Sequence, residues 1–323
     1  MLSFTMSRPL PLLLLLMTIA SPSPAQPSGE LWLDLVEGEE TTEGAILADL
    51  ATAGVVYVGE AHTIARHHAL QLHLLEQLQA RGLPLVLCFE QLEASVQPAV
   101  DRYNRGEIDF ASLATQTNWA KQWRNYTDYQ PLCEFAHKHG IPLRALNAPA
   151  GVIRAISRGG GLAKLPADQR ATLPAEIVTD DPAYERMMNL QLAVHMAMDP
   201  AQLRTVFEAQ VARDETMAAN IAAGRRIDAP ADHPRTAFVI IGAGHVRYGQ
   251  GTAARVRRLV PGITERIVLF TESGQLKLTE SDKAASREIQ ITHGQLRESG
   301  QPPGDYIHVL PLAVANTPPA SKP

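Results

Sequence analysis

The sequence predicts an α/β protein with a mostly parallel central sheet, flanking helices and an inserted pair of long helices. Three observations support this fold class. Short apolar, β-branched runs recur along the chain, segments with helical periodicity fill most of the intervals, and two long helical patterns follow one another with no strand between them. Continuous apolar runs are typical of strands that a parallel sheet buries on both faces.

The clearest predicted strands are residues 55–58, 85–89, 142–146 and 237–241, with further candidates at 266–270 and 306–310. Leucines at helical spacing predict a helix from Leu70 to Leu78, which Gly82-Leu83-Pro84 ends. Other helices are predicted over 93–103 and 130–139, and Trp119, Trp123 and Tyr126 also have helical spacing. The long pair covers 182–198 and 201–223, and we expect it to cap one edge of the sheet.

The ends of the chain differ in composition from its centre. Arg8 precedes an apolar stretch over 10–20 and small residues up to Ala25, which is the order of a secretory signal peptide. We therefore expect cleavage after Ala25 and an exported protein, periplasmic or secreted, with no cysteine near that point for a lipid anchor. One α/β domain is expected over 30–311, followed by a disordered tail over 312–323.

Bulk composition excludes some classes of function. The chain has 323 residues with a formal net charge of -5 and no long basic run, so nucleic acid is not expected as a partner. Cys88 and Cys133 are the two cysteines. Cys88 lies inside an apolar run, which favours a buried free thiol, although export permits a disulfide between the two.

Polar residues follow four predicted strands at the point where each one ends. Gly59-Glu60-Ala61-His62 follows the first strand, Glu90 the second, Asn147 the third, and Gly242-Ala243-Gly244-His245 the fourth. Ligands of open parallel sheets bind outside the carboxyl ends of the strands, so these residues mark a candidate site. The glycines allow sharp turns and close approach of the backbone to a ligand.

This set of side chains permits two kinds of chemistry. Histidines and carboxylates bind transition metals, and the candidate metal ligands are Glu60, His62, Glu90 and His245. A carboxylate beside a histidine can also transfer protons. The alternatives are structural: Glu60 could cap the following helix, and His245 could satisfy a loop carbonyl.

Other polar and aromatic residues have weaker signals. His67 and His68 point to different helix faces and are more often solvated than ligating. Arg213-Asp214-Glu215 is typical of a solvated face, although Arg213 could pair with Glu60 or Glu90 or hold a ligand carboxylate. The tryptophans fit packing best, whereas a loop tyrosine beside an apolar pocket could ligate ferric haem.

Six separated motifs occur in an order that resembles one family: VYVGEAHTIARHH, LCFEQ, the aromatic segment at 119–132, LNAP, ARDETMA and VIIGAGHVRYGQG. The chain is similar to the ChaN-like haem-binding proteins of the Tiki and erythromycin-esterase superfamily, from about residue 31 to 310. The resemblance implies an α/β core with extra helices and a role in bacterial iron acquisition. It also implies two face-to-face haems between two monomers, each iron held by a tyrosine.

The resemblance does not decide which tyrosine ligates haem, and Tyr126, Tyr129 and Tyr248 stay open as candidates. His62, His245 and Arg213 are the other candidate haem contacts. The leading hypothesis is an exported haem-binding protein for haem or iron uptake or trafficking. Its expected partners are a second copy of the chain, with haem at the interface, and outer-membrane or periplasmic haem-uptake components. The alternative is a metal-dependent hydrolase, an esterase or peptidase, in which Glu60, His62 and His245 are catalytic and a divalent metal is bound.

Overall fold

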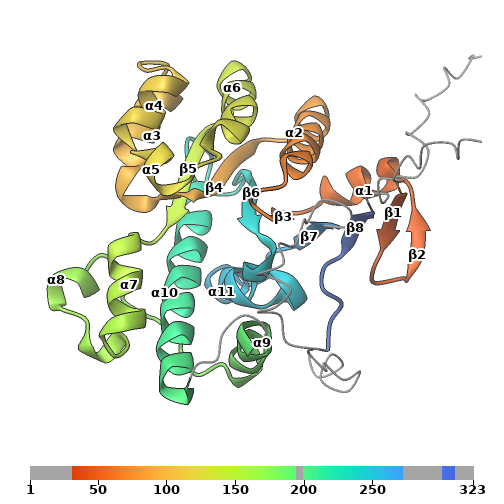
Figure 1. Ribbon diagram of the computed structural model, residues 1–323. Helices are drawn as coiled ribbons and strands as arrows, with labels where there is room; N and C mark the ends of the chain where they lie inside the picture. The colour runs from red at the N-terminus through yellow and green to blue at the C-terminus, as the bar shows by residue number, and fades with distance from the viewer. Residues whose placement is uncertain (1–30, 194–198, 272–299, 310–323) are drawn as a thin grey trace, which may run out of the picture.

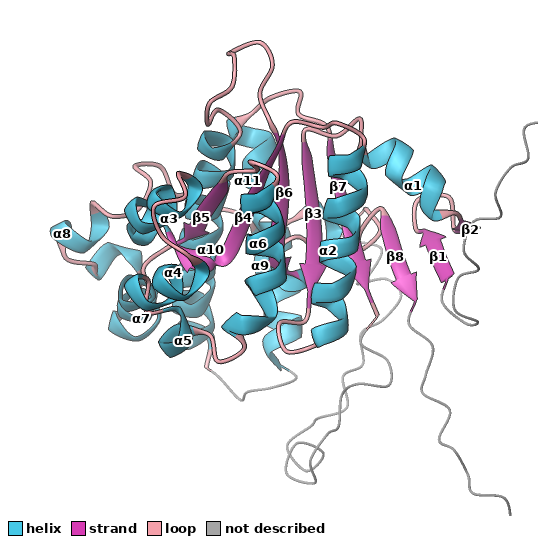
Figure 2. Cartoon of the chain, turned by 90° about the horizontal axis from the view of Figure 1, so that it is seen from above, coloured by secondary structure: helices cyan, strands magenta, loops and turns pink. Residues whose placement is uncertain are grey.

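The computed structural model describes residues 31–193, 199–271 and 300–309, and in this part of the chain eight strands form one sheet in the order β2-β1-β8-β7-β3-β6-β4-β5. The strands from β8 to β5 pair in parallel, whereas β1 is antiparallel to both β8 and β2. Figure 2 shows them side by side, with β5 at one end and β1 and β2 at the other. The predicted α/β fold with a mostly parallel sheet is confirmed.

The strands are β1 (Leu31–Asp34), β2 (Glu39–Thr41), β3 (Val55–Glu60), β4 (Leu85–Glu93), β5 (Leu143–Asn147), β6 (Thr236–Gly242), β7 (Glu265–Phe270) and β8 (Tyr306–Val309). The α-helices are α1 (Glu43–Leu50), α2 (Ala65–Ala80), α3 (Gln97–Asn104), α4 (Phe110–Gln116), α5 (Trp119–Gln122), α6 (Gln130–Lys138), α7 (Ala150–Gly159), α8 (Ala167–Arg170), α9 (Pro182–Ala193), α10 (Pro200–Gly224) and α11 (Gly251–Leu259). Short 3-10 turns are η1 (Ala94–Val96), η2 (Tyr126–Tyr129), η3 (Leu162–Lys164), η4 (Ala243–His245) and η5 (Arg247–Gly249).

Both faces of the sheet are covered, which is why its central strands are apolar throughout. Along β3, Val56 and Val58 belong to the core on the side of α2 and α6, and Val55 and Tyr57 belong to the core on the side of α10 and α11. Successive side chains of a strand point to opposite faces, so each strand supplies both cores. Figure 1 shows α1 to α6 on one side of the sheet and α9 to α11 on the other.

The structure corrects three local predictions. β4 continues to Glu93, so the helix expected from residue 93 begins instead at Gln97, after a 3-10 turn. The helical spacing of Trp119, Trp123 and Tyr126 is not one helix, because α5 stops at Gln122 and Trp123 has an extended backbone. The strands β1 and β2 and the helix α1 were not among the predicted elements.

The second long helix, α10, does not simply cap an edge of the sheet. It lies at the β5 end but across one face, where Met217, Ala218 and Ile221 join the core of that face. Three predictions lie outside the described residues: the signal peptide expected over 1–25, the tail expected over 312–323, and residues 194–198 of the predicted helix 182–198. In the described part of the chain, no helix has the length and apolar character needed to cross a membrane. Both cysteines are buried free thiols, as expected for Cys88.

Candidate functional site

The strand order places four strand ends side by side. β6 lies between β3 and β4, and β5 is next to β4. The residues that follow these strands therefore reach one edge of the sheet, as the sequence predicted. Glu60 is in register with Gly242. Asn147 Nδ2 donates a hydrogen bond to the backbone oxygen of Glu90 at 3.0 Å.

Glu60 lies at the centre of one half of the site. Its Oε2 accepts a 2.6 Å hydrogen bond from Gln71, and its Oε1 accepts bonds of 2.8 Å from Gln91 and 2.6 Å from the Tyr129 hydroxyl. His62 Nδ1 lies 2.7 Å from Oε1, and His68 Nδ1 lies 3.3 Å from Oε2. A buried carboxylate with this many donors is held in its ionised form. Burial opposes that form, but His62 and His68 hold the pKa of Glu60 well below its usual range.

His245 lies at the centre of the other half. Its Nδ1 is 2.6 Å from Asp214 Oδ1 on α10, and its Nε2 is 3.3 Å from Glu90 Oε1 on β4. Thr252 and Tyr184 donate their hydroxyls to Asp214 at 2.8 Å each. Asp214 is thus fixed by hydrogen bonds on both of its oxygens.

These contacts change the protonation of the central groups. Burial would lower the pKa of His245, but Glu90 and Asp214 outweigh it and raise the pKa to about 9. Burial would raise the pKa of Glu90, but His245 and His62 lower it to about 2. His245 is consequently a cation at neutral pH, and Glu90 is an anion.

His62 connects the two halves and faces outward. The His62 Nε2 atom lies 4.0 Å from Glu90 Oε1, and the side chain is 31% exposed. The His62 and Trp123 rings meet edge to face, with their centroids 4.7 Å apart. A Cβ atom on Gly242 would come within 2.8 Å of His62 Nε2. The absence of a side chain at Gly242 thus leaves room for the His62 ring in its present position.

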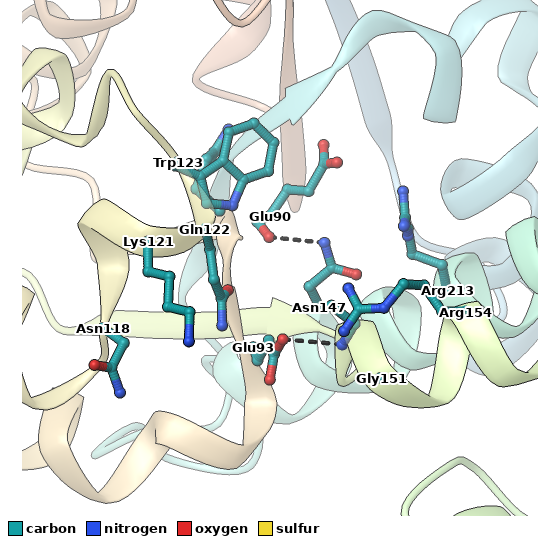
Figure 3. Close-up of a pocket in the computed structure, with 12 residues that line it drawn as sticks. Glu90, Glu93, Asn118, Lys121, Gln122, Trp123, Asn147, Gly151, Arg154 and Arg213 are labelled. Atoms are coloured by element: carbon teal, nitrogen blue, oxygen red, sulfur yellow. Dashed lines mark hydrogen bonds between the residues drawn. The ribbon is translucent and has the colours of Figure 1, made fainter.

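A cavity of about 560 Å³ opens beside this network. In Figure 3, Glu90, Glu93 and Asn147 lie near the centre, with Trp123 and Lys121 on one side of them and Arg154 and Arg213 on the other. Gln91, Asn118, Gln122, Ala150 and Gly151 complete the lining. The cavity falls in the usual size range of small-molecule sites, about 300–1,000 Å³.

Arg213 lines the cavity and forms no ion pair with Glu60 or Glu90, the two partners that the sequence suggested. Its Nε is buried and has no hydrogen-bond partner in the described part of the chain. An arginine in this position is free to bind a ligand carboxylate.

The three candidate haem tyrosines have different environments. Tyr129 is fully buried and donates its hydroxyl to Glu60, and burial together with that carboxylate raises its pKa far above the usual value. In this arrangement a phenolate is disfavoured at Tyr129 and its hydroxyl is used by Glu60, so the geometry does not favour Tyr129 as an iron ligand. Tyr126 is partly exposed and stacks on Phe110, and Tyr248 is partly exposed in a left-handed turn with φ 60°.

Sequence reasoning missed Asp214 and undervalued His68. Both were interpreted as solvated, yet Asp214 is fully buried and His68 is 4% exposed. One feature of the sequence could have indicated that Asp214 is buried. Its neighbours in α10 are small apolar residues, and this face of the helix packs against α11. Of the adjacent histidines, only His68 reaches Glu60, and His67 accepts a hydrogen bond from the backbone of Ala61 instead.

The proposed metal ligands do not form a metal centre. Among the described residues, no group of three or more histidine, cysteine, aspartate or glutamate side chains is arranged to hold a metal ion. The physical reason is visible at Glu60, whose two oxygens already accept hydrogen bonds from Gln71, Gln91 and Tyr129.

Comparison with known proteins agrees with this fold. Residues 46–256 match the sequence model of the family described as haem-binding uptake, Tiki superfamily, ChaN, and the chain belongs to this family. ChaN of Campylobacter jejuni, which binds haem cofacially, has a TM-score of 0.62 at 16% identity, covering 88% of this chain and 98% of that one. An erythromycin esterase variant in its open conformation has a TM-score of 0.47 at 11% identity, covering 88% and 98%. No curated protein matches the sequence.

Proposed function

We propose that this protein binds haem at the carboxyl edge of its sheet and serves haem or iron uptake or trafficking outside the cytoplasm. Membership of the haem-binding family over residues 46–256 is the observation that carries the proposal. The order of motifs along the chain and the signal-like amino terminus agree with it.

The residues of the cavity fit part of a haem group. Haem has a flat apolar ring and two propionate carboxylates. Trp123 offers an aromatic wall, and Arg213, Arg154 and Lys121 offer cations for the propionates. Arginine suits this role because its planar guanidinium binds carboxylates through two parallel hydrogen bonds.

The iron ligand is not part of the cavity lining, which contains neither a tyrosine nor a histidine among the described residues. Bound haem would supply a ferric iron that accepts a phenolate ligand. Tyr126 and Tyr248 remain the candidates because both side chains are partly exposed. His62 and His245 then shape the edge of the site rather than hold the iron.

A homodimer with haem at its interface is part of the proposal. ChaN of Campylobacter jejuni binds haem cofacially, and an open cavity at the surface of one chain suits a site that a second chain completes. Delivery to or from periplasmic or outer-membrane uptake components follows as the expected role.

Haemin titration of the mature protein tests the proposal. We expect a stoichiometric Soret shift, a change in its position on replacing the ligating tyrosine in Tyr126→Phe or Tyr248→Phe, and weaker binding in Arg213→Ala. Sedimentation with and without haemin measures dimer formation. A spectrum identical to that of free haemin at every ratio would contradict haem binding.

A hydrolase is the second candidate, and one observation favours it. His245 lies between two carboxylates, Asp214 and Glu90, as histidines used in proton transfer often do. Because its pKa is about 9, His245 would act as an acid, and the exposed His62 would carry protons to the cavity. Metal analysis and an esterase and peptidase panel on the wild type and His62→Ala test this. Equal activity in both proteins, or none, argues against it.

A further inference from the structure

Two residues that line the cavity each carry a buried acceptor atom without a hydrogen-bond partner among the described residues. The atoms are Gln91 Oε1 and Asn147 Oδ1, on side chains from residues that are 1% and 8% exposed. Buried polar atoms are usually satisfied, and leaving one unpaired costs about 1–3 kcal/mol. Two such acceptors at one cavity indicate a ligand that donates hydrogen bonds.

The orientation of both amides is set by their nitrogens. Gln91 Nε2 donates to the Glu60 carboxylate at 2.8 Å, and Asn147 Nδ2 donates to the backbone oxygen of Glu90 at 3.0 Å. Rotating either amide would place its oxygen against another oxygen, which is unfavourable. Gln91 Oε1 and Asn147 Oδ1 are therefore acceptors, and a ligand that pairs with them must donate N–H or O–H groups.

The remaining charges of the cavity are divided between two kinds of side chain. Glu90, Glu93 and the acceptor Gln91 come from β4 and the acceptor Asn147 comes from β5, whereas Arg213 comes from α10 and Arg154 from α7 (Figure 3). No ion pair joins Arg213, Arg154 or Lys121 to a carboxylate in the described part of the chain. A ligand that is complementary to both kinds carries a positive or donor group at one end and a carboxylate at the other.

We propose that this cavity binds an α-amino carboxylate, either a free amino acid or the carboxyl-terminal residue of a short peptide. Its amino or amide N–H groups donate to Gln91 Oε1 and Asn147 Oδ1, and its carboxylate binds Arg213, with Arg154 and Lys121 nearby. The volume of about 560 Å³ leaves room for a side chain or for further residues.

This ligand is distinct from haem. An iron porphyrin has no N–H group and no hydroxyl on its ring, so haem propionates could meet Arg213 but would leave Gln91 and Asn147 unpaired. The inference therefore goes beyond haem binding and does not depend on it.

Isothermal titration of the haem-free protein tests the inference. The probes are the free amino acids and a set of dipeptides, each compared with its carboxamide and with the acid that lacks the amino group. We expect binding of the intact α-amino carboxylate and a loss of about tenfold or more in affinity for each analogue that lacks one group. Stronger binding of dipeptides than of free amino acids would identify a peptide end as the ligand.

Variants locate the binding groups. Arg213→Ala and Asn147→Ala should each weaken binding by about tenfold or more, because each removes a group that binds the ligand. Asn147→Ala also removes the hydrogen bond to the Glu90 backbone oxygen, so urea unfolding of that variant measures the loss of stability separately. Arg158→Ala, at an exposed arginine of α7 that is not part of the cavity lining, is the matched control and should bind as the wild type does. Arg213 Nε makes no hydrogen bond with the part of the chain that the structure describes, so Arg213→Ala should unfold like the wild type. No binding by any probe at millimolar concentration, or binding unchanged in both variants, would overturn the proposal.

Discussion

Replacing Tyr129 with phenylalanine separates a structural role from an iron-ligating one. The Tyr129 hydroxyl donates a 2.6 Å hydrogen bond to Glu60, and the ring is fully buried between His68, Phe89 and Trp119. Phenylalanine keeps the ring and its packing, so the substitution removes one hydrogen bond and leaves no cavity larger than an oxygen atom.

The cost follows from that bond. A hydrogen bond to a buried charged group contributes about 1.5–3 kcal/mol to stability. Glu60 keeps its bonds from Gln71 and Gln91 and its contact with His62, so the lower part of this range applies, about 1.5–2 kcal/mol. For a domain of this size each kcal/mol lowers the melting temperature by about 2–4 °C, which gives a decrease of about 3–8 °C.

Urea unfolding followed by circular dichroism measures the stability, and haemin titration of the same samples measures haem binding. We expect Tyr129→Phe to be less stable and to bind haemin with a normal Soret spectrum. Tyr126→Phe is the control for the stability measurement alone, since its hydroxyl makes no hydrogen bond with the described residues and its ring keeps the stack on Phe110. A Tyr129→Phe protein with wild-type stability and no haem binding would refute this reasoning.

Three further predictions concern the other half of the site. The pKa of His245 is raised from 6.5 to about 9, so its contribution to stability is complete below pH 6.5 and is lost as the pH rises through 9. Glu90, with its pKa lowered from 4.5 to about 2, contributes above pH 4.5 and loses its effect as the pH falls towards 2. Unfolding free energy measured across this range should therefore decline on both sides, and a flat profile would count against the two assignments. Asp214→Asn should lower the pKa of His245 in an NMR titration, because it removes one of the two anions beside the ring, and an unchanged value would show that Glu90 alone sets it. Gly242→Ala should displace His62 towards solvent, since the new Cβ would lie 2.8 Å from Nε2, with a cost below about 1.5 kcal/mol because the ring can rotate away. A large loss of stability in that variant would mean that His62 is held more firmly than its exposure suggests.

Local sequence patterns were reliable where burial alone decides the structure. The runs that became β3, β6 and β7 are apolar because helices cover both faces of the sheet, and each prediction lies within the observed strand. The short strands β1 and β2 carry no such pattern, because β2 is an edge strand, β1 lies next to it, and both are partly exposed. Trp119 and Trp123 had helical spacing, but Trp123 leaves the helix and turns toward His62.

The location of the site was predictable for a related reason. Parallel strands end at a common edge, so polar residues after consecutive apolar runs converge whatever their exact partners are. Glu60, His62, Glu90 and His245 were found in this way. The roles of these residues could not be predicted, because a role depends on which groups form hydrogen bonds with each oxygen and nitrogen.

The sequence by itself determined the parallel α/β core, the edge of the sheet where the polar residues gather, and the family to which the chain belongs. Only the tertiary structure decided that Asp214 of α10 holds His245 and that Tyr129 is a buried partner of Glu60. It also decided that Gln91 and Asn147 line a cavity, each with a buried oxygen that has no hydrogen-bond partner among the described residues. These facts arise from contacts between segments far apart in the chain, and no local periodicity encodes which buried donor meets which acceptor.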